Sequence, residues 1–255
     1  MTASLRAAFH RRLGSVREFG QRVELLAEQV RGRPTEQLLD LLAELTRAAV
    51  RRDPSALEAV LAWIVLSVAP GTPLAARERE LFREAQARND PLLYTLLQPP
   101  FPTVVTEPPP GRVLTTRDGR PLTLGERRAV ARRGNRFLLD RLLADPDAEV
   151  VARVLRNPAL TEREAVRIAA WRSARAEVLV EVLRCPRWAT QPAVQAALAR
   201  NPSTPVALAT RLVLLLPSPK LREVARDLEA PLLVRLACRR QLEASGGRRR
   251  LASAQ

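Results

Sequence analysis

The feature that most constrains the fold of this 255-residue sequence is a short joint that recurs between apolar, arginine-containing segments. The joints read Arg156-Asn157-Pro158, Arg184-Cys185-Pro186 and Arg200-Asn201-Pro202, with Arg226-Asp227 as a variant that lacks the proline. A proline cannot continue a helix, and the residue before it is biased away from helical backbone. The chain between about residues 125 and 242 is therefore predicted to be a succession of short helices that fold back on one another.

The segments between the joints resemble one another. The strings "EVVARVLRNP" (149–158) and "EVLVEVLRCP" (177–186) align without a gap at an offset of 28 residues. Pro158 and Pro202 are separated by 44 residues, and Pro186 and Pro231, which follows the Asp227 joint by four residues, are separated by 45. That distance is the length of a two-helix unit in HEAT-type arrays, so the pattern indicates internal repetition, although an irregular one.

Polar residues at the expected helix starts support this division. Thr123 with Glu126, and Thr161 with Glu164, fit the T-x-x-E capping box, in which two side chains reciprocally satisfy backbone N–H groups. Thr204 is placed to cap the helix after the third joint, and its replacement by alanine is expected to cost about 1 kcal/mol.

Three strings carry a resemblance to a known superfamily: "RNPALTEREAVRIAA" (156–170), "RNPSTPVALATRLV" (200–213) and "RDLEAPLLVRLAC" (226–238). They resemble the units of HEAT-like and leucine-rich-repeat-variant helical-repeat proteins, and residues 143–170 are similar to uncharacterised proteins of GC-rich bacteria. The resemblance covers about residues 125–242. It implies an α-solenoid of HEAT-like helix pairs and specifies no chemistry.

Some leucine-rich-repeat-variant proteins carry a cysteine-bound iron–sulfur cluster. The only two cysteines, Cys185 and Cys238, lie 53 residues apart in apolar helical contexts and do not supply its ligands. They fit small buried thiols in a reducing compartment. The N-terminal sequence has no continuous apolar run of the kind found in signal peptides, so we expect a soluble, cytoplasmic protein.

Residues 1–98 predict a helical domain. The segments 15–32 and 35–52 carry apolar residues at helical spacing, and the segment 53–69 is apolar nearly all round. We expect this third segment to be a central helix with Trp63 in the core. Its strongly apolar part is only about 11 residues long, too short to span a membrane.

The remaining segments complete an all-α fold class with one exception. Residues 99–124 predict a proline-rich linker, in which Asp118-Gly119 indicates one small β-hairpin within residues 112–124. Residues 125–242 are the predicted solenoid, and residues 243–255 are predicted to be a disordered basic tail.

The positive charge is concentrated in the second part of the chain. Of the net charge of +15, residues 1–98 carry +2 and residues 99–255 carry +13. Such a field attracts acidic partners. The alternative is compositional, since Lys220 is the only lysine and a GC-rich genome favours arginine whatever the function.

No catalytic, cofactor-binding or metal-binding residues are predicted, and no cofactor. His10 is the only histidine, and no phosphate-binding glycine motif occurs. We expect a non-enzymatic protein-interaction scaffold or adaptor whose partner has an acidic surface; its oligomeric state stays open. The alternatives are a nucleic-acid-binding module and a HEAT-like alkylpurine DNA glycosylase. For the latter, Trp171 and Trp188 are candidate aromatic contacts, although both also fit interhelical packing.

The candidate binding residues for an acidic partner are three arginine pairs, each four residues apart on one helix face. They are Arg163 and Arg167, Arg222 and Arg226, and Arg235 and Arg239. If these faces align, they form a concave groove suited to carboxylates or phosphates. The alternative is a solvated outer face, partly neutralised by acidic neighbours such as Glu223 and Asp227.

Overall fold

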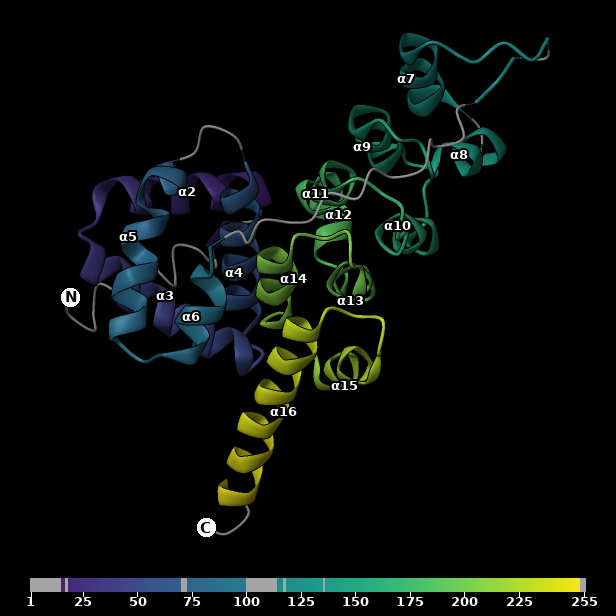
Figure 1. Cartoon of the computed structure of the whole chain (residues 1–255). Coiled ribbons are helices and arrows are strands. Elements are labelled where there is room, and N and C mark those ends of the chain that lie inside the picture. The colour runs from purple at the N-terminus through teal and green to yellow at the C-terminus, as the bar shows by residue number, and fades with distance from the viewer. Residues whose placement is uncertain are drawn as a thin grey trace.

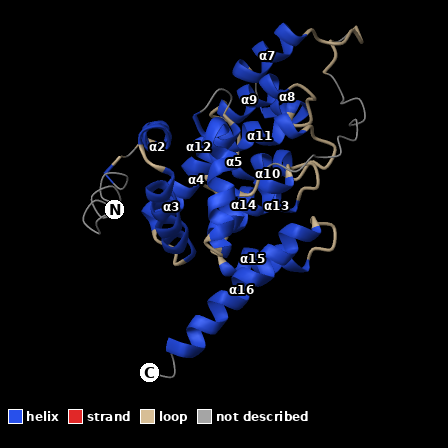
Figure 2. Ribbon diagram, turned by 60° about the vertical axis from the view of Figure 1, so that its left-hand side comes forward, coloured by secondary structure: helices blue, strands red, loops and turns tan. Residues whose placement is uncertain are grey.

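A computed structural model describes residues 15–16, 18–69, 73–99, 114–116, 118–134 and 136–252. These residues form fifteen helices and no sheet (Figure 2), which confirms the all-α prediction. None of the described helices is both long and apolar enough to cross a membrane.

The first five described helices include a central one, against which others pack. They are α2 (Phe19–Gly32), α3 (Thr35–Val50), α4 (Pro54–Val68), α5 (Pro73–Ala87) and α6 (Pro91–Leu97). Helix α4 contacts α2, α3 and α5, and Trp63 in its middle is 1% exposed, so the predicted central helix is confirmed. Asp53 caps α4 by accepting the Ala56 N–H at 2.8 Å, and a proline occupies the first turn, where its missing N–H costs nothing.

Ten helices follow. They are α7 (Leu124–Arg133), α8 (Arg136–Leu142), α9 (Ala148–Arg156), α10 (Glu162–Ala169), α11 (Ala176–Arg184), α12 (Pro186–Ala189), α13 (Pro192–Arg200), α14 (Val206–Val213), α15 (Ser218–Arg226) and α16 (Leu232–Ala252). The joints end helices where the sequence predicts. The four-residue helix α12 was not expected.

These ten helices are arranged mainly in two rows (Figure 1). The first row runs α7, α9, α11, α14, α16, and the second row runs α8, α10, α13, α15. Helix α9 packs on both α7 and α11, and α16 packs on α14; in the second row, α13 packs on both α10 and α15. These helices bury an apolar face against their neighbours. In α9 this face consists of Val150, Val151, Val154 and Leu155.

The Asn157 joint fastens α9 to α7. The side chain is 5% exposed, and its Nδ2 donates to the carbonyl oxygens of Ala131 (2.9 Å) and Arg132 (3.3 Å) in the last turn of α7. Its Oδ1 accepts the Ala159 N–H at 3.0 Å. One amide thus closes its own turn and satisfies the carbonyls left unpaired at the preceding helix end.

The Asn201 joint repeats this arrangement in the second row. Its Nδ2 donates to the carbonyl oxygens of Ala169 (2.8 Å) and Trp171 (3.0 Å), at the end of α10, and its Oδ1 accepts the Ser203 N–H at 2.9 Å. Asn201 is 2% exposed. The two asparagines therefore make equivalent bonds in different rows.

The other two joints make related contacts with other chemistry. The Cys185 thiol donates to the Leu155 carbonyl oxygen of α9 at 3.7 Å, and the half-buried Asp227 accepts the Glu229 N–H at 3.0 Å. The joints at 157 and 185 end first-row helices, whereas those at 201 and 227 end second-row helices. Because the short α12 lies between these two sets, the spacing of the joints in the sequence is irregular.

The predicted cap at Thr204 is wrong. Helix α14 begins at Val206, with Pro205 as its N-cap residue and no side-chain cap bond. The Thr204 hydroxyl is buried and has no hydrogen-bond partner. The turn closed by Asn201, which accepts the Thr204 N–H at 3.0 Å, carries this side chain into the core one residue before the cap position.

Both predicted capping boxes form. At the start of α7, Thr123 Oγ1 accepts the Glu126 N–H (3.3 Å), and the Glu126 carboxylate accepts the Thr123 N–H (2.7 Å). The Arg120 guanidinium, which donates to the Glu126 carboxylate, and the backbone N–H and hydroxyl of Thr123, which also donate to it, lower the pKa of Glu126 to about 2. At α10, the Glu164 carboxylate accepts the Thr161 N–H at 2.8 Å.

Two segments differ from the expectations. Of the predicted hairpin (112–124), residues 112, 113 and 117 lie outside the described residues, and the described part forms one isolated antiparallel bridge between Thr115 and Pro121, with Gly119 at φ 79° in its turn. Proline at the bridge has no N–H to extend a ladder. The segment from residue 243, expected to be a disordered tail, continues α16 as helix to Ala252, since no proline or joint interrupts it; residues 253–255 lie outside the described residues.

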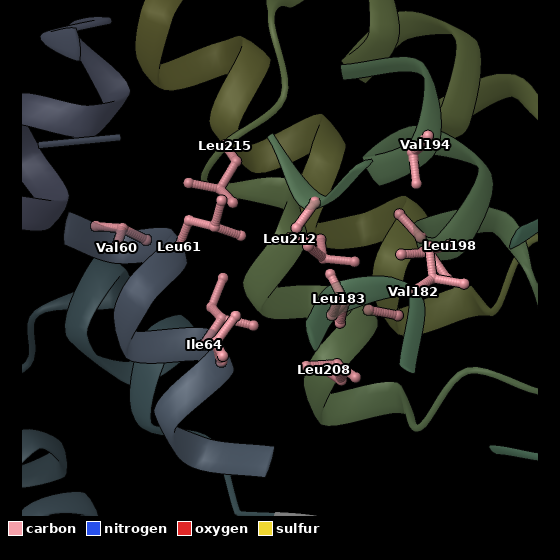
Figure 3. Close-up of a cluster of buried hydrophobic side chains, with 14 of the residues drawn as sticks. Val60, Leu61, Ile64, Val182, Leu183, Val194, Leu198, Leu208, Leu212 and Leu215 are labelled. Carbon is pink, nitrogen blue, oxygen red and sulfur yellow. The ribbon is translucent and has the colours of Figure 1, made fainter. Parts of the chain in front are cut away.

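The first five helices and the two rows share one hydrophobic core. Figure 3 shows Leu61 and Ile64 of α4 facing Leu208, Leu212 and Leu215 of the α14 region. Nearby, Arg211 is only 4% exposed, and its guanidinium donates to the Glu78 carboxylate of α5 (2.8 Å) and to the Gln98 carbonyl oxygen (2.7 Å). The segments predicted as a helical domain and a solenoid are therefore packed together.

Candidate functional site

A cleft of about 580 Å³ lies along the first row. It is lined by Arg132 of α7, by Ala148, Glu149, Ala152, Arg153 and Arg156 of α9, by Asn157 and Pro158 of the joint, and by Glu181 of α11. Three helices and one joint thus contribute to one surface. We call this feature the arginine cleft.

The sequence of α9 explains why its polar face forms the cleft. Its valines and Leu155 are fully buried against the core, which leaves Glu149, Arg153 and Arg156 on the opposite side. The arginines lie in the last turn of the helix, where a positive charge interacts favourably with the helix dipole. Arg132 occupies the same position in α7.

The acidic residues of the cleft are already paired. Glu149 forms ion pairs with Arg128 (2.6 Å) and Arg153 (3.3 Å), and Glu181 pairs with Arg184 at 2.6 Å. Their charges are therefore largely neutralised within the protein. Their oxygens do not compete for the remaining arginines.

Arg132 and Arg156 are exposed and form no ion pair within the part of the chain that the structure describes. The Asn157 amide turns away toward α7, and the carbonyl oxygens of Ala131 and Arg132 accept its protons. The cleft therefore offers two uncompensated guanidinium groups. Guanidinium binds carboxylate or phosphate groups through two parallel hydrogen bonds, so an anionic ligand suits this site.

The sequence analysis missed Arg132 and Arg156. A signal was present for Arg156, because an arginine precedes each joint at positions 156, 184, 200 and 226. Arg200 pairs with Glu223 at 2.9 Å, and Arg184 pairs with Glu181, so these two are occupied. The pair of Arg184 is local, three residues apart within α11, whereas that of Arg200 joins α13 to α15, a contact between separate helices that a local pattern does not reveal.

The six predicted arginines lie on three helices. Arg163 and Arg167 are on α10 and Arg222 and Arg226 on α15, both in the second row, whereas Arg235 and Arg239 are on α16 in the first row. Helix α13 separates α10 from α15, and its residues Val194–Ala199 are all buried. Each arginine pair thus shares one helix. Between the two second-row pairs lies α13, whose only arginine is Arg200 at its C-terminal end.

The surroundings of these arginines differ. Arg167 pairs with Asp140, at 2.5 Å, in an exposed ion pair of the kind that contributes little to stability. Arg163, Arg222, Arg226 and Arg239 are exposed without an ion pair to any described residue, and Arg235 is half-buried. Glu223 and Asp227, which were predicted to neutralise these arginines in part, form ion pairs with Arg200 instead.

The two candidate tryptophans differ in burial. Trp188 is 3% exposed, and its Nε1 donates to the Leu155 carbonyl oxygen at 2.7 Å while the Arg187 guanidinium covers its ring at 4.3 Å. Trp171 is half-buried against the core, and its carbonyl oxygen accepts a bond from Asn201. The ring of Trp188 is therefore not available to stack on a base.

The described residues contain no group of three His, Cys, Asp or Glu side chains that could hold a metal ion. His10 lies outside the described residues. Both cysteines are buried and unpaired, and burial raises the pKa of Cys185 and raises that of Cys238 to about 12. Neither thiol is in the ionised form that a nucleophile or metal ligand requires near neutral pH.

Comparison with protein-family models, with curated proteins and with solved structures gave no match. The described residues define an all-α protein with a cleft that holds two arginines, Arg132 and Arg156, without an ion pair to a described residue.

Proposed function

We propose that the chain is a non-enzymatic interaction scaffold whose arginine cleft binds a protein partner with an acidic surface. The observation that carries this proposal is the state of Arg132 and Arg156, which are exposed in one cleft without a carboxylate partner among the described residues. An acidic segment entering the cleft replaces water around two guanidinium groups with charge-assisted hydrogen bonds.

We interpret the two rows as a short, irregular α-solenoid of HEAT-like helix pairs. The stacking of α7, α9 and α11, together with the asparagine joints that fasten successive helix ends, supports this interpretation. In such an array, neighbouring helices present a continuous surface to a partner, and binding needs no catalytic group.

The test compares partner capture by two double variants of the full chain. The change Arg132→Ser with Arg156→Ser removes both unpaired guanidinium groups of the cleft. The matched control, Arg79→Ser with Arg83→Ser, removes two exposed arginines of α5. Chemical cross-linking in the native cell, followed by mass spectrometry, is expected to identify a protein that the cleft variant loses and the control keeps. A partner captured equally by both variants would contradict the proposal.

A nucleic-acid-binding module is the second candidate, favoured by the net charge of +13 over residues 99–255 and by the unpaired arginines of α10 and α15. It predicts measurable affinity for DNA or RNA at about 0.15 M salt, falling steeply as salt rises. Fluorescence anisotropy with labelled duplex and single strands tests this. Binding that appears only below physiological salt eliminates this candidate and leaves the scaffold.

A further inference from the structure

An exposed apolar patch lies where the second row passes into α16. Leu228, Leu232, Leu233 and Leu236 are 79%, 60%, 45% and 38% exposed, respectively. Leu232 and Leu236, four residues apart, and Leu233 and Leu236, three apart, follow helical spacing on α16. Leu228 lies in the turn before α16 and the other three lie in its first turns, so four exposed large apolar side chains fall within nine consecutive residues. Exposed apolar side chains placed this close together mark an interaction site. We call these four residues the leucine patch.

The corresponding face of α14 is covered within the protein. When the joint at Asn201 is aligned with the joint at Asp227, Leu233 corresponds to Ala207 and Leu236 to Thr210. Both α14 residues are buried, at 4% and 3% exposure. Helix α6 packs on this helix, and Gln98, which follows α6, accepts a hydrogen bond from the Thr210 hydroxyl at 3.1 Å.

Helix α6 therefore illustrates what the patch can bind. It is a short apolar helix, "PLLYTLL", that contacts α14, and Gln98 directly after it bonds Thr210, the register position that Leu236 occupies in α16. On α16 these positions carry larger apolar side chains than on α14, and no described helix covers them. The face is thus suited to a short helix supplied by another molecule.

The charges around the patch select the chemistry of that helix. Arg239 and Arg240, one turn further along α16, are exposed and form no ion pair with a described residue. The nearby Glu229 is engaged by Arg172 at 2.7 Å, so it does not balance them. Two copies of the chain meeting at this face would bring like charges together, which disfavours self-association.

We infer that the leucine patch docks a short amphipathic helix of a partner protein, with an apolar face against the leucines and acidic residues beside Arg239 and Arg240. This surface lies at the opposite end of the rows from the arginine cleft (Figure 1). It extends the proposed scaffold by a second binding surface and does not rest on the first.

The probe is a synthetic amphipathic peptide of about four helical turns, with leucines on one face and glutamates flanking them. Its binding to the full chain is followed by fluorescence anisotropy. Leu232→Gln and Leu236→Gln are each expected to weaken the affinity at least about tenfold, because each removes a side chain that becomes buried. Both positions are exposed, so the fold tolerates the change, which circular dichroism verifies.

The matched control is Phe137→Gln, which removes another exposed apolar side chain, on α8, and is expected to leave the affinity unchanged. A peptide with lysine in place of glutamate is expected to bind at least about tenfold more weakly. The double variant Arg132→Ser, Arg156→Ser is expected to bind the acidic peptide as tightly as the unaltered chain, so failure at the cleft and at the patch can be distinguished.

Three results would each overturn the inference. The leucine variants could retain the native affinity, or the lysine peptide could bind as tightly as the glutamate peptide. Sedimentation velocity could also reveal a dimer that Leu236→Gln dissociates, in which case a second copy of the chain occupies the patch.

Discussion

At the scale of single residues, the joints depend on whether a side chain can donate hydrogen bonds. Asn157 and Asn201 each donate to two carbonyl oxygens and accept one N–H while almost fully buried. An ionised aspartate has no donor and could not replace them. Asp227 serves at a half-exposed joint, where it accepts one N–H and lies 3.9 Å from Arg200.

This difference gives a first prediction. Asn157→Ala and Asn201→Ala should each lower the free energy of unfolding by about 3 kcal/mol, because buried backbone carbonyls and an N–H lose their partners. Asp227→Ala is the matched control, and should cost less than about 1 kcal/mol because water reaches that joint. Urea unfolding followed by circular dichroism measures all three, and equal costs would show that the asparagine bonds are not what fastens the helices.

Thr204 gives a second prediction, opposite in sign to the loss of a cap. Because its buried hydroxyl has no hydrogen-bond partner, Thr204→Val should leave the stability unchanged or raise it by up to about 1 kcal/mol. Thr123→Val, at a capping box that does form, should instead lower the stability by about 1 kcal/mol. Thermal unfolding measures the stability of both variants. A loss of stability in Thr204→Val would mean that its hydroxyl does stabilise the fold, as a capping residue would.

At the scale of helices, the sequence predicted most starts and stops because prolines and polar caps act locally. The central position of α4 was also predictable, since a helix that is apolar all round can only be buried. Helix α12 was missed because four residues are too few to show a period. The change from first-row joints at 157 and 185 to second-row joints at 201 and 227 was missed for the same reason, since it depends on that helix.

The tryptophans provide a third prediction, at the scale of helix packing. Trp188→Phe should lower the free energy of unfolding by about 1–2 kcal/mol more than Trp63→Phe does. Both changes remove a similar ring volume from the core, but the Trp188 Nε1–H bonds α9 through Leu155, whereas that of Trp63 is buried without a partner. Denaturant unfolding measures both, and equal costs would mean that the bond to α9 contributes nothing.

The candidate site was less predictable than the helices. An excess of arginine in residues 99–255 correctly indicated where positive charge gathers, but local spacing selected pairs on separate helices. Which arginines stay unpaired is decided by contacts such as Arg128 with Glu149 on another helix. Those contacts follow from the stacking of helices and not from any single segment.

At the scale of the whole molecule, the buried Arg211 holds the first five helices against the two rows. Its guanidinium is shared between Glu78 and the Gln98 carbonyl oxygen, and the Gln98 side chain also accepts from Thr210. Burial lowers the pKa of Arg211, and Glu78 opposes that shift. Removing one member of such a buried set leaves the other without compensation.

The fourth prediction follows. Arg211→Ala should lower the free energy of unfolding by about 3–5 kcal/mol, whereas Arg88→Ala, at the exposed pair with Asp40, should cost less than about 1 kcal/mol. The unaltered chain should unfold in one transition, because both parts share a core. Calorimetry measures both quantities. Two separate transitions in the unaltered chain would mean that residues 1–98 fold independently.

The placement of that contact has a mechanical consequence. The first five helices meet the rows chiefly at α14 and α11, while α7, α8 and α9 extend beyond them (Figure 1). The rows are therefore held at α11 and α14, and small tilts between the helices beyond α11 add up to the largest displacement at α7. The arginine cleft spans this stretch, from α7 at the free end through α9 to Glu181 of the held α11, so bending of the row changes its width.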